Sequence, residues 1–118
     1  MFGLAAGIVA LVALGCLVAY AVVLTFRWLK NKIKEKMQQK NVSKVACADL
    51  KQLIEECDNT VFLNELKDYV DKGYTHIIAS VDNSGHISDV DIVKDTSSSM
   101  DREVDRFLGR DGMVVVTN

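Results

Sequence analysis

Two histidines, His76 and His86, are the side chains of this chain best suited to acid–base chemistry near neutral pH. Neither lies next to a serine or cysteine in a recognisable nucleophile motif. The serine run at 97–99 sits where a helix should begin, because Ser98 and Asp101 have the spacing of a capping box. The chain also has no glycine-rich phosphate-binding motif. We therefore expect no enzymatic activity and no cofactor.

Calcium is the one metal for which the spacing gives a partial match. From Ser80 to Asp91 the chain follows part of an EF-hand loop, with Gly85 at the sixth place and an acid at the twelfth. Serines occupy the first and fifth places, so the loop offers two carboxylates, too few for tight Ca²⁺ binding. No metal is expected. We interpret the acidic residues of this region as a solvated hairpin face: Asp82, Asp89, Asp91 and Asp95.

The cysteines have no metal-binding or disulfide spacing. Cys47 and Cys57 share one apolar face of a helix expected over residues 43–57, together with Leu50 and Ile54. Ten residues of continuous helix separate the two thiols by about 15 Å, too far for a disulfide. Both are predicted to be core residues, and Cys16 is predicted to fill space in an apolar segment.

That apolar segment, residues 1–26, contains no charged side chain. About 20 apolar residues in a helix cross the ~30 Å hydrocarbon core of a bilayer, so the run predicts a transmembrane helix. A cleaved signal peptide is the weaker alternative, since a basic start and a clear cleavage site are missing. Small residues on helical spacing predict helix packing in the membrane, either with another copy or with other membrane-protein subunits: Gly3, Gly7 and Ala10.

The residues after the apolar run are strongly basic. Residues 27–40 hold six Lys or Arg against one Glu, a net charge of +5. Cytoplasmic flanks carry this excess, so we expect the N-terminus outside and the C-terminal domain in the cytoplasm. The predicted contacts with membrane lipid at the interface are Arg27, Trp28, Lys30, Lys32, Lys34 and Lys36.

Residues 27–42 are predicted to form a basic helical connector, because Leu29, Ile33 and Met37 recur every four residues. This helix is either a solvated spacer or an amphipathic stripe that binds the interface or a partner. Residues 41–118 hold 8 basic and 15 acidic residues, a net charge of −7. Such a domain is a poor nucleic-acid binder, because phosphate contacts require a basic surface.

The patterns in residues 43–118 predict a small α+β domain with the element order α-α-β-β-α-β. In this domain helices would cover a three-stranded sheet. A bulge near Ser88 and Asp89 would bring the apolar residues of the second strand onto one face. The last strand is expected at a sheet edge, pairing either within the chain or with another protein. The expected elements are helices over 43–57, 60–72 and 100–108, and strands over 75–81, 86–94 and 113–117.

Part of this domain, residues 74–108, resembles the C-terminal domain of TonB-type proteins. The match consists of a first strand at 77–82, a turn at Ser84-Gly85, a second strand at 85–93 and a helix opening at 100–104. The resemblance implies a hairpin-helix-strand fold and partner binding by strand pairing. The chain lacks the proline-rich spacer of that family, whose domain lies in the periplasm. The lysines after the apolar run predict instead that this domain lies in the cytoplasm. The family's role in energising outer-membrane receptors therefore does not carry over.

Together these observations predict a non-enzymatic, single-pass membrane protein. It would act as an accessory or assembly subunit of a membrane complex and contact a partner through its acidic domain. The alternative is a TonB-like or sensor-type binding domain that faces the periplasm or the exterior. The two differ in topology, because the second requires the C-terminus outside.

Overall fold

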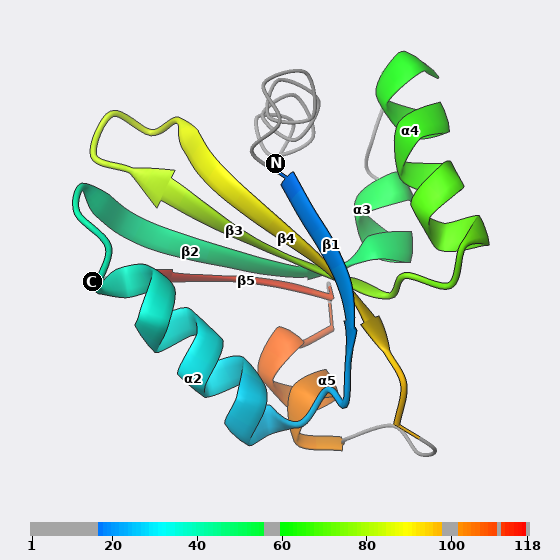
Figure 1. Cartoon of the computed structure of the whole chain (residues 1–118), viewed down its shortest axis with the longest axis horizontal. Coiled ribbons are helices and arrows are strands. Elements are labelled where there is room, and N and C mark those ends of the chain that lie inside the picture. Colours follow the sequence, from blue (N-terminus) through cyan, green and yellow to red (C-terminus); the bar gives the residue numbers. More distant parts are fainter. Residues whose placement is uncertain (1–16, 56–59, 98–101, 111, 118) are drawn as a thin grey trace.

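The computed structural model describes residues 17–55, 60–97, 102–110 and 112–117. Five strands form one sheet in the order β1-β4-β3-β2-β5 (Figure 1). Neighbouring strands are antiparallel, except that β1 runs parallel to β4. The elements along the chain are β1 (Leu17–Val22), α2 (Phe26–Met37), β2 (Val42–Asp49), α3 (Leu50–Glu55), α4 (Thr60–Asp71), β3 (His76–Asp82), β4 (Ile87–Asp95), α5 (Arg102–Leu108) and β5 (Met113–Thr117).

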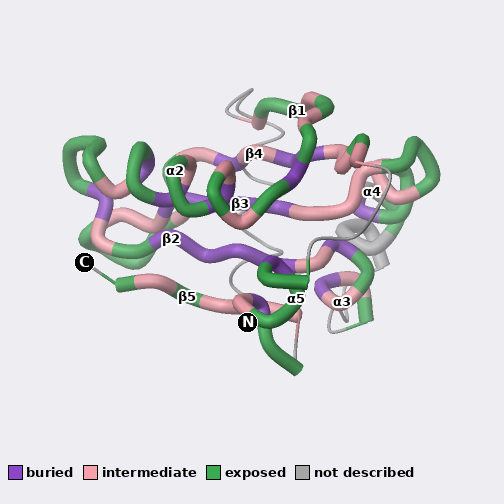
Figure 2. The backbone as a smooth tube through the Cα atoms, turned by 90° about the horizontal axis from the view of Figure 1, so that it is seen from below, coloured by how far each residue is buried: buried purple, intermediate pink, exposed green. Residues whose placement is uncertain are grey.

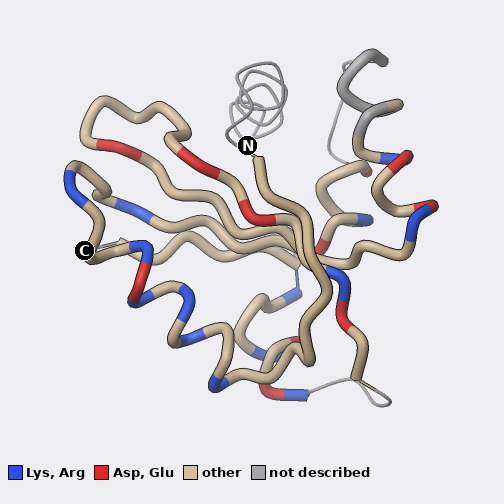
Figure 3. Tube along the Cα trace, in the orientation of Figure 1, with Lys and Arg blue, Asp and Glu red and all other residues tan. Residues whose placement is uncertain are grey.

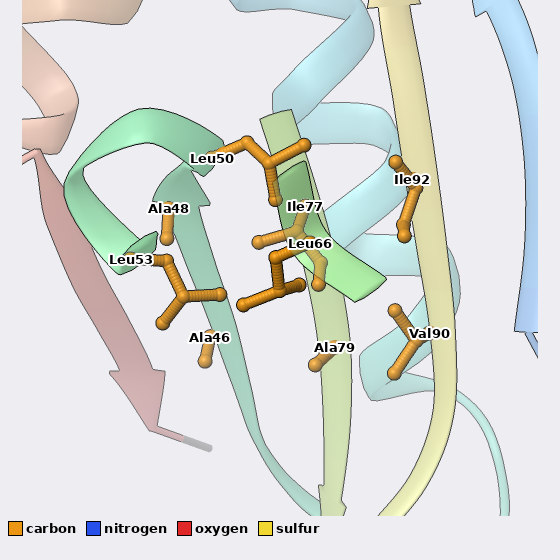
Figure 4. Close-up of a cluster of buried hydrophobic side chains, with 9 residues drawn as sticks. All are labelled: Ala46, Ala48, Leu50, Leu53, Leu66, Ile77, Ala79, Val90 and Ile92. Atoms are coloured by element: carbon orange, nitrogen blue, oxygen red, sulfur yellow. The ribbon is translucent and has the colours of Figure 1, made fainter. Parts of the chain in front are cut away.

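Helices cover both faces of the sheet, so the domain has two hydrophobic cores. Alternate residues of a strand point to opposite faces, and the central strands are apolar on both. On one face α3 and α4 cover the first core, which Figure 4 shows: Ala46, Ala48, Leu50, Leu53, Leu66, Ile77, Ala79, Val90 and Ile92. On the other face α2 and α5 cover the second core: Leu24, Leu29, Ile33, Val42, Val45, Cys47, Ile78, Val104 and Leu108.

The prediction of a membrane-spanning helix over residues 1–26 is wrong where the structure describes this segment. Residues 17–22 are a strand of the sheet, and Phe26 is the first residue of α2. Across the described ranges, no helix combines the length and the apolarity needed to cross a membrane. The single-pass localisation, with its N-terminus outside and its C-terminal domain in the cytoplasm, therefore lacks its basis. The predicted packing residues Gly3, Gly7 and Ala10 lie outside the described residues.

The apolar run was misleading because the described part of it is an uncharged edge strand followed by a buried leucine and the start of a helix, and these also contain no charges. Thr25 marks the division within the run: it has extended backbone, and its side chain accepts a hydrogen bond from the Trp28 amide at 3.1 Å. This is the geometry of a helix N-cap. Leu24, just before the cap, is buried in the core under α2. A threonine inside the run was the sequence signal for a strand-turn-helix segment.

The expected helix over 43–57 is also wrong in its first half, where β2 takes its place. Val45 and Cys47 point into one core, and Ala46 and Ala48 point into the other. A central strand buried on both faces reads as a continuous apolar run, and periodicity cannot distinguish such a run from a buried helix. Cys47 is buried as predicted, but in a strand.

The second half of the chain follows its local signals closely. The helix expected over 60–72 is α4, the two hairpin strands are β3 and β4, and the last strand is β5. The bulge near Ser88 is confirmed, because Ser80 pairs with Asp89 while the next residue, Val81, pairs with Ile87. The hairpin turn ends at Gly85, whose φ of +84° is the left-handed conformation that glycine favours. The sheet nevertheless has five strands, because β1 and β2 join the three expected ones.

Candidate functional site

The two edges of the sheet are the places where this fold can accept further backbone pairing. Within the described residues β5 pairs only with β2, and β1 pairs only with β4. Figure 2 shows that the central strands contain the buried segments, whereas β1 and β5 are intermediate or exposed along their length. An edge strand presents a row of backbone groups without a neighbour in its own sheet.

The pairing of β5 with β2 determines which backbone groups face outward. The Asp49 amide donates to the Gly112 carbonyl at 2.7 Å, one step beyond the paired residues Ala48 and Met113. In an antiparallel pair, residues that exchange hydrogen bonds alternate with residues that do not. Val114 and Val116 therefore bond to β2. The residues that turn their N–H and C=O groups to the open edge are Met113, Val115 and Thr117.

The side chains of β5 do not protect this edge. The strand reads MVVVT, without charge or proline, and its pairing with β2 has no register shift. Natural edge strands are commonly guarded by lysines, prolines or bulges. Val114 and Val116 pack against the core under α2 and α5, whereas 45% of Val115 is exposed. The edge is therefore apolar and open within the described structure.

A second notable feature is a buried lysine on the opposite half of the sheet. Lys36, near the end of α2, is only 3% exposed. Its Nζ lies 2.6 Å from Asp89 Oδ1 and 3.0 Å from Asp91 Oδ1, both on β4. Ser80 on β3 donates a hydrogen bond to the same Asp89 oxygen at 2.8 Å. Two carboxylates thus compensate the buried ammonium group, and the serine hydroxyl in turn supports one of these carboxylates.

Tyr20 and Lys32 complete this cluster around Asp91. The Tyr20 hydroxyl donates to Asp91 Oδ2, and Lys32 Nζ lies 3.6 Å from the same oxygen. Burial raises the pKa of Asp91, but the hydrogen bonds from Tyr20 and Lys36 outweigh it, so the pKa lies below its usual value. Burial and the Asp91 carboxylate raise the pKa of Tyr20. Because every partner is engaged, we interpret the cluster as an attachment of α2 to β1, β3 and β4.

The acidic face predicted for the hairpin is thus only partly solvated. Asp91 keeps 13% of its side chain exposed, because α2 and Tyr20 cover it. Asp82 instead accepts hydrogen bonds from the amides of Ser84 and His86 and so shapes the turn. Among the residues that the structure describes, no three His, Cys, Asp or Glu side chains are grouped to hold a metal ion.

The residues predicted to contact lipid all lie on α2, but they face different ways. Figure 3 shows basic residues following one another along this helix. Trp28 is half-buried with its ring 6.3 Å from that of Tyr20, and Lys32 lies 5.9 Å above the Trp28 ring. Lys36 is in the buried cluster. The exposed members of the set are Arg27, Lys30 and Lys34.

A hollow of about 590 Å³ lies between the first turn of α2 and α5. Its polar lining, which includes Arg27, Lys30 and Glu103, is exposed to solvent. A ligand site normally combines apolar enclosure with a few buried, convergent polar groups. This hollow lacks that combination, so we assign it no ligand.

The two histidines lie far apart on the β3–β4 hairpin, His76 at the start of β3 and His86 directly before β4. His86 is exposed beside the hairpin turn, and His76 is half-buried at the start of the strand, with Nδ1 2.8 Å from Thr75 Oγ1. Burial lowers the pKa of His76, although the nearby carboxylates of Asp49, Asp95 and Asp105 act in the opposite direction. The Thr75 hydroxyl beside His76 also donates to the Val93 carbonyl at 3.3 Å and accepts from the Asp95 amide at 3.3 Å, so we interpret it as part of the backbone attachment between β3 and β4.

The lowered pKa of His76 predicts a pH-dependent stability. Because the folded chain binds the proton less tightly than the unfolded chain, the stabilisation is complete above the ordinary histidine pKa of 6.5. It is lost as the pH falls from there through the lowered pKa of the folded state. Melting temperatures between pH 5 and pH 8 should decline toward acid, and His76→Gln should flatten this decline. His86→Gln, at the exposed histidine, should leave it unchanged; an equal flattening would contradict the assignment.

None of three comparisons, with models of protein families, with curated proteins and with solved structures, found a match for this chain. The functional argument therefore rests on the geometry of the domain itself. The edge formed by Met113, Val115 and Thr117 is the candidate functional site. Sequence reasoning had anticipated the edge position of this strand, but not which backbone groups face outward.

Proposed function

We propose that this chain is a non-catalytic binding domain that adds an extended segment of a partner protein to the open edge of β5. The observation that carries the proposal is the outward direction of the N–H and C=O groups of three alternate residues, Met113, Val115 and Thr117. Strand addition satisfies such groups by main-chain hydrogen bonds, and side chains then select the sequence. An accessory or assembly role follows, because the domain would contribute a sheet edge rather than chemistry.

The chemistry of β5 defines the segment that fits. The side chains on either face of the edge are valines, Met113 and Thr117, with no charge among them. Cross-strand pairs of β-branched residues stabilise a sheet, whereas a charged side chain opposite a valine makes no comparable stabilising contact. We therefore expect the partner segment to be extended, uncharged and rich in valine, isoleucine or threonine over about five residues.

The resemblance to TonB-type domains supports the same binding mode, and it stays a prediction. In the described structure the hairpin β3–β4 is followed by α5 and then by β5, which is the element order that the resemblance implies. Strand pairing at β5 would be the shared property. For the other form of that alternative, a sensor-type domain, the solvent-exposed hollow between α2 and α5 gives no support, because it does not enclose a ligand.

Amide hydrogen exchange tests the edge without knowledge of the partner. In the monomeric chain at low concentration, the amides of Val114 and Val116 should exchange slowly, because they bond to β2. The amides of Met113, Val115 and Thr117 should exchange fast, because they face solvent. Peptides selected from a library of extended sequences should then slow exchange at these three positions. Uniform exchange along β5 would show that the edge is not built as described.

A pair of substitutions at one position separates backbone pairing from side-chain contact. Val115→Pro removes an outward N–H and leaves the bonds to β2 intact, so we expect at least tenfold weaker binding of selected peptides. Val115→Thr keeps the N–H and a β-branched side chain and should bind within about twofold of the parent chain. Equal binding by both variants, with both folded by circular dichroism, would overturn the proposal.

A further inference from the structure

We infer that a second copy of this chain occupies the same edge, so that two β5 strands pair about a two-fold axis and close the binding site. This inference rests on the proposed function, since it names one partner for the edge described there. The arrangement is isologous: the same residues contact each other in both copies. It would join two five-stranded sheets into one continuous sheet.

The outward residues of β5 match their own copy in register. With the two-fold axis at Val115, this residue lies opposite its equivalent, and Met113 lies opposite Thr117 in both directions. All three are outward residues, so each pair exchanges both of its hydrogen bonds. No outward backbone group of the strand is left over within residues 113–117. The axis is perpendicular to the sheet, so equivalent helix layers of the two copies lie on the same side of the joined sheet.

The side chain at the two-fold axis favours this edge for self-pairing over the edge at β1, whose strand is also uncharged. Strand β5 carries no charge, so the axis brings no like charges together, and the net charge of the whole chain is only −2. Val115, which is 45% exposed, would gain a β-branched partner. At β1 the outward residues are Leu17, Ala19 and Ala21, so a two-fold axis at the central one pairs alanine with alanine instead of valine with valine. Val18, which is 55% exposed, would there lie opposite Tyr20.

The size of the contact limits its strength. A pair of five-residue strands buries far less than the about 1,600 Å² of a standard stable interface. We therefore expect reversible association at micromolar or higher concentrations, which a longer or better-matched partner segment can displace. The dimer would hold the edge closed when no partner is present and would keep it from pairing at random with other chains.

Cysteine cross-linking at β5 tests the register directly. In a full-length chain with Cys16, Cys47 and Cys57 replaced by alanine, Val115→Cys places two thiols on residues whose Cα atoms are about 5.5 Å apart, within disulfide range. Mild oxidation should convert it to a covalent dimer. Thr117→Cys is the matched control: it faces position 113, and its own equivalent is about 13 Å away along the strand. It should cross-link at least tenfold more slowly.

Sedimentation of the full-length chain without cysteine changes gives the second measurement. Self-association should weaken at least tenfold in Val115→Pro and stay within about twofold in Val115→Thr. Equal cross-linking of Val115→Cys and Thr117→Cys, or a chain that stays monomeric up to millimolar concentration, would overturn the dimer. If selected peptides still slow amide exchange at Met113, Val115 and Thr117 in that case, strand addition stands and only the second copy is excluded.

Discussion

Replacing Lys36 by methionine should lower the free energy of unfolding by about 3 kcal/mol, a large share of the 5–15 kcal/mol typical of a domain. The side chain is 3% exposed, and its ammonium group lies within 3.0 Å of both Asp89 and Asp91. Methionine has similar length and fills the same space, so the loss comes from two carboxylates left close together without their cation. We place the effect at the lower end of the range because Asp89 keeps 32% of its side chain exposed and can be hydrated.

Urea unfolding of the full chain, followed by circular dichroism, measures this effect. Lys34→Met is the matched control: it removes a charge from the same helix at an exposed position and should change the stability by less than about 0.5 kcal/mol. Adding Asp91→Asn to Lys36→Met should restore part of the loss, because one of the uncompensated charges disappears. A Lys36→Met variant as stable as the control would show that the cluster does not hold α2 on the sheet.

The pH dependence of this cluster has a definite sign. The folded pKa of Asp91 lies below its ordinary value of 3.8, so its contribution to stability is complete above that pH. It is lost as the pH falls through the lowered folded pKa. The Lys36→Met variant should show a smaller loss over the same acid range, since the lysine is one of the groups that lower this pKa.

Leu24→Ala should be comparably destabilising, with a loss of about 3 kcal/mol in the free energy of unfolding. Leu24 is 2% exposed and packs in the core under α2, together with Leu29 and Ile33. The substitution removes buried methyl and methylene groups and leaves a cavity beneath the first turn of that helix. In a lipid-facing position the same change would have little effect on the folding of the domain.

Val23→Ala provides the comparison, because Val23 is the preceding residue in the same apolar run and is 59% exposed. We expect its effect to stay below about 0.5 kcal/mol. The two substituted residues are neighbours in the sequence, but the side chain of Leu24 faces the core and that of Val23 faces solvent. Equal losses in urea unfolding would contradict the placement of residues 17–24 in the sheet and its helix-covered core.

These stability variants act far from the proposed binding edge. Lys36 and its carboxylate partners belong to the half of the sheet at β4, whereas β5 lies at the opposite edge, beyond β3 and β2. Effects at separated sites without shared partners are generally additive. Lys36→Met chains that remain folded should therefore bind peptides at β5 normally, and Val115→Pro should leave the lysine cluster intact.

The sequence by itself determined the elements whose signals are local. The hairpin of β3 and β4 follows from two apolar, β-branched runs around a turn at Asp82–Gly85, and the bulge follows from the broken alternation at Ser88. Helix α4 follows from its 3.6-residue periodicity, and β5 from three consecutive valines after Gly112. In each case a few neighbouring residues suffice, because turn chemistry and hydrophobic period act over short distances.

Only the tertiary structure decided the fate of residues 17–26 and 42–49. An uncharged run fits a membrane helix until a distant strand pairs with it, as β4 pairs with β1. A run such as VSKVACAD fits a helix face until distant strands and helices bury both of its faces. The same holds for Lys36, because its carboxylate partners lie more than 50 residues away and cover it only when α2 packs on β4. Whether a residue is buried depends on which elements pack against each other. Local sequence preferences allow several such arrangements, and only the long-range strand pairing and helix packing select one of them.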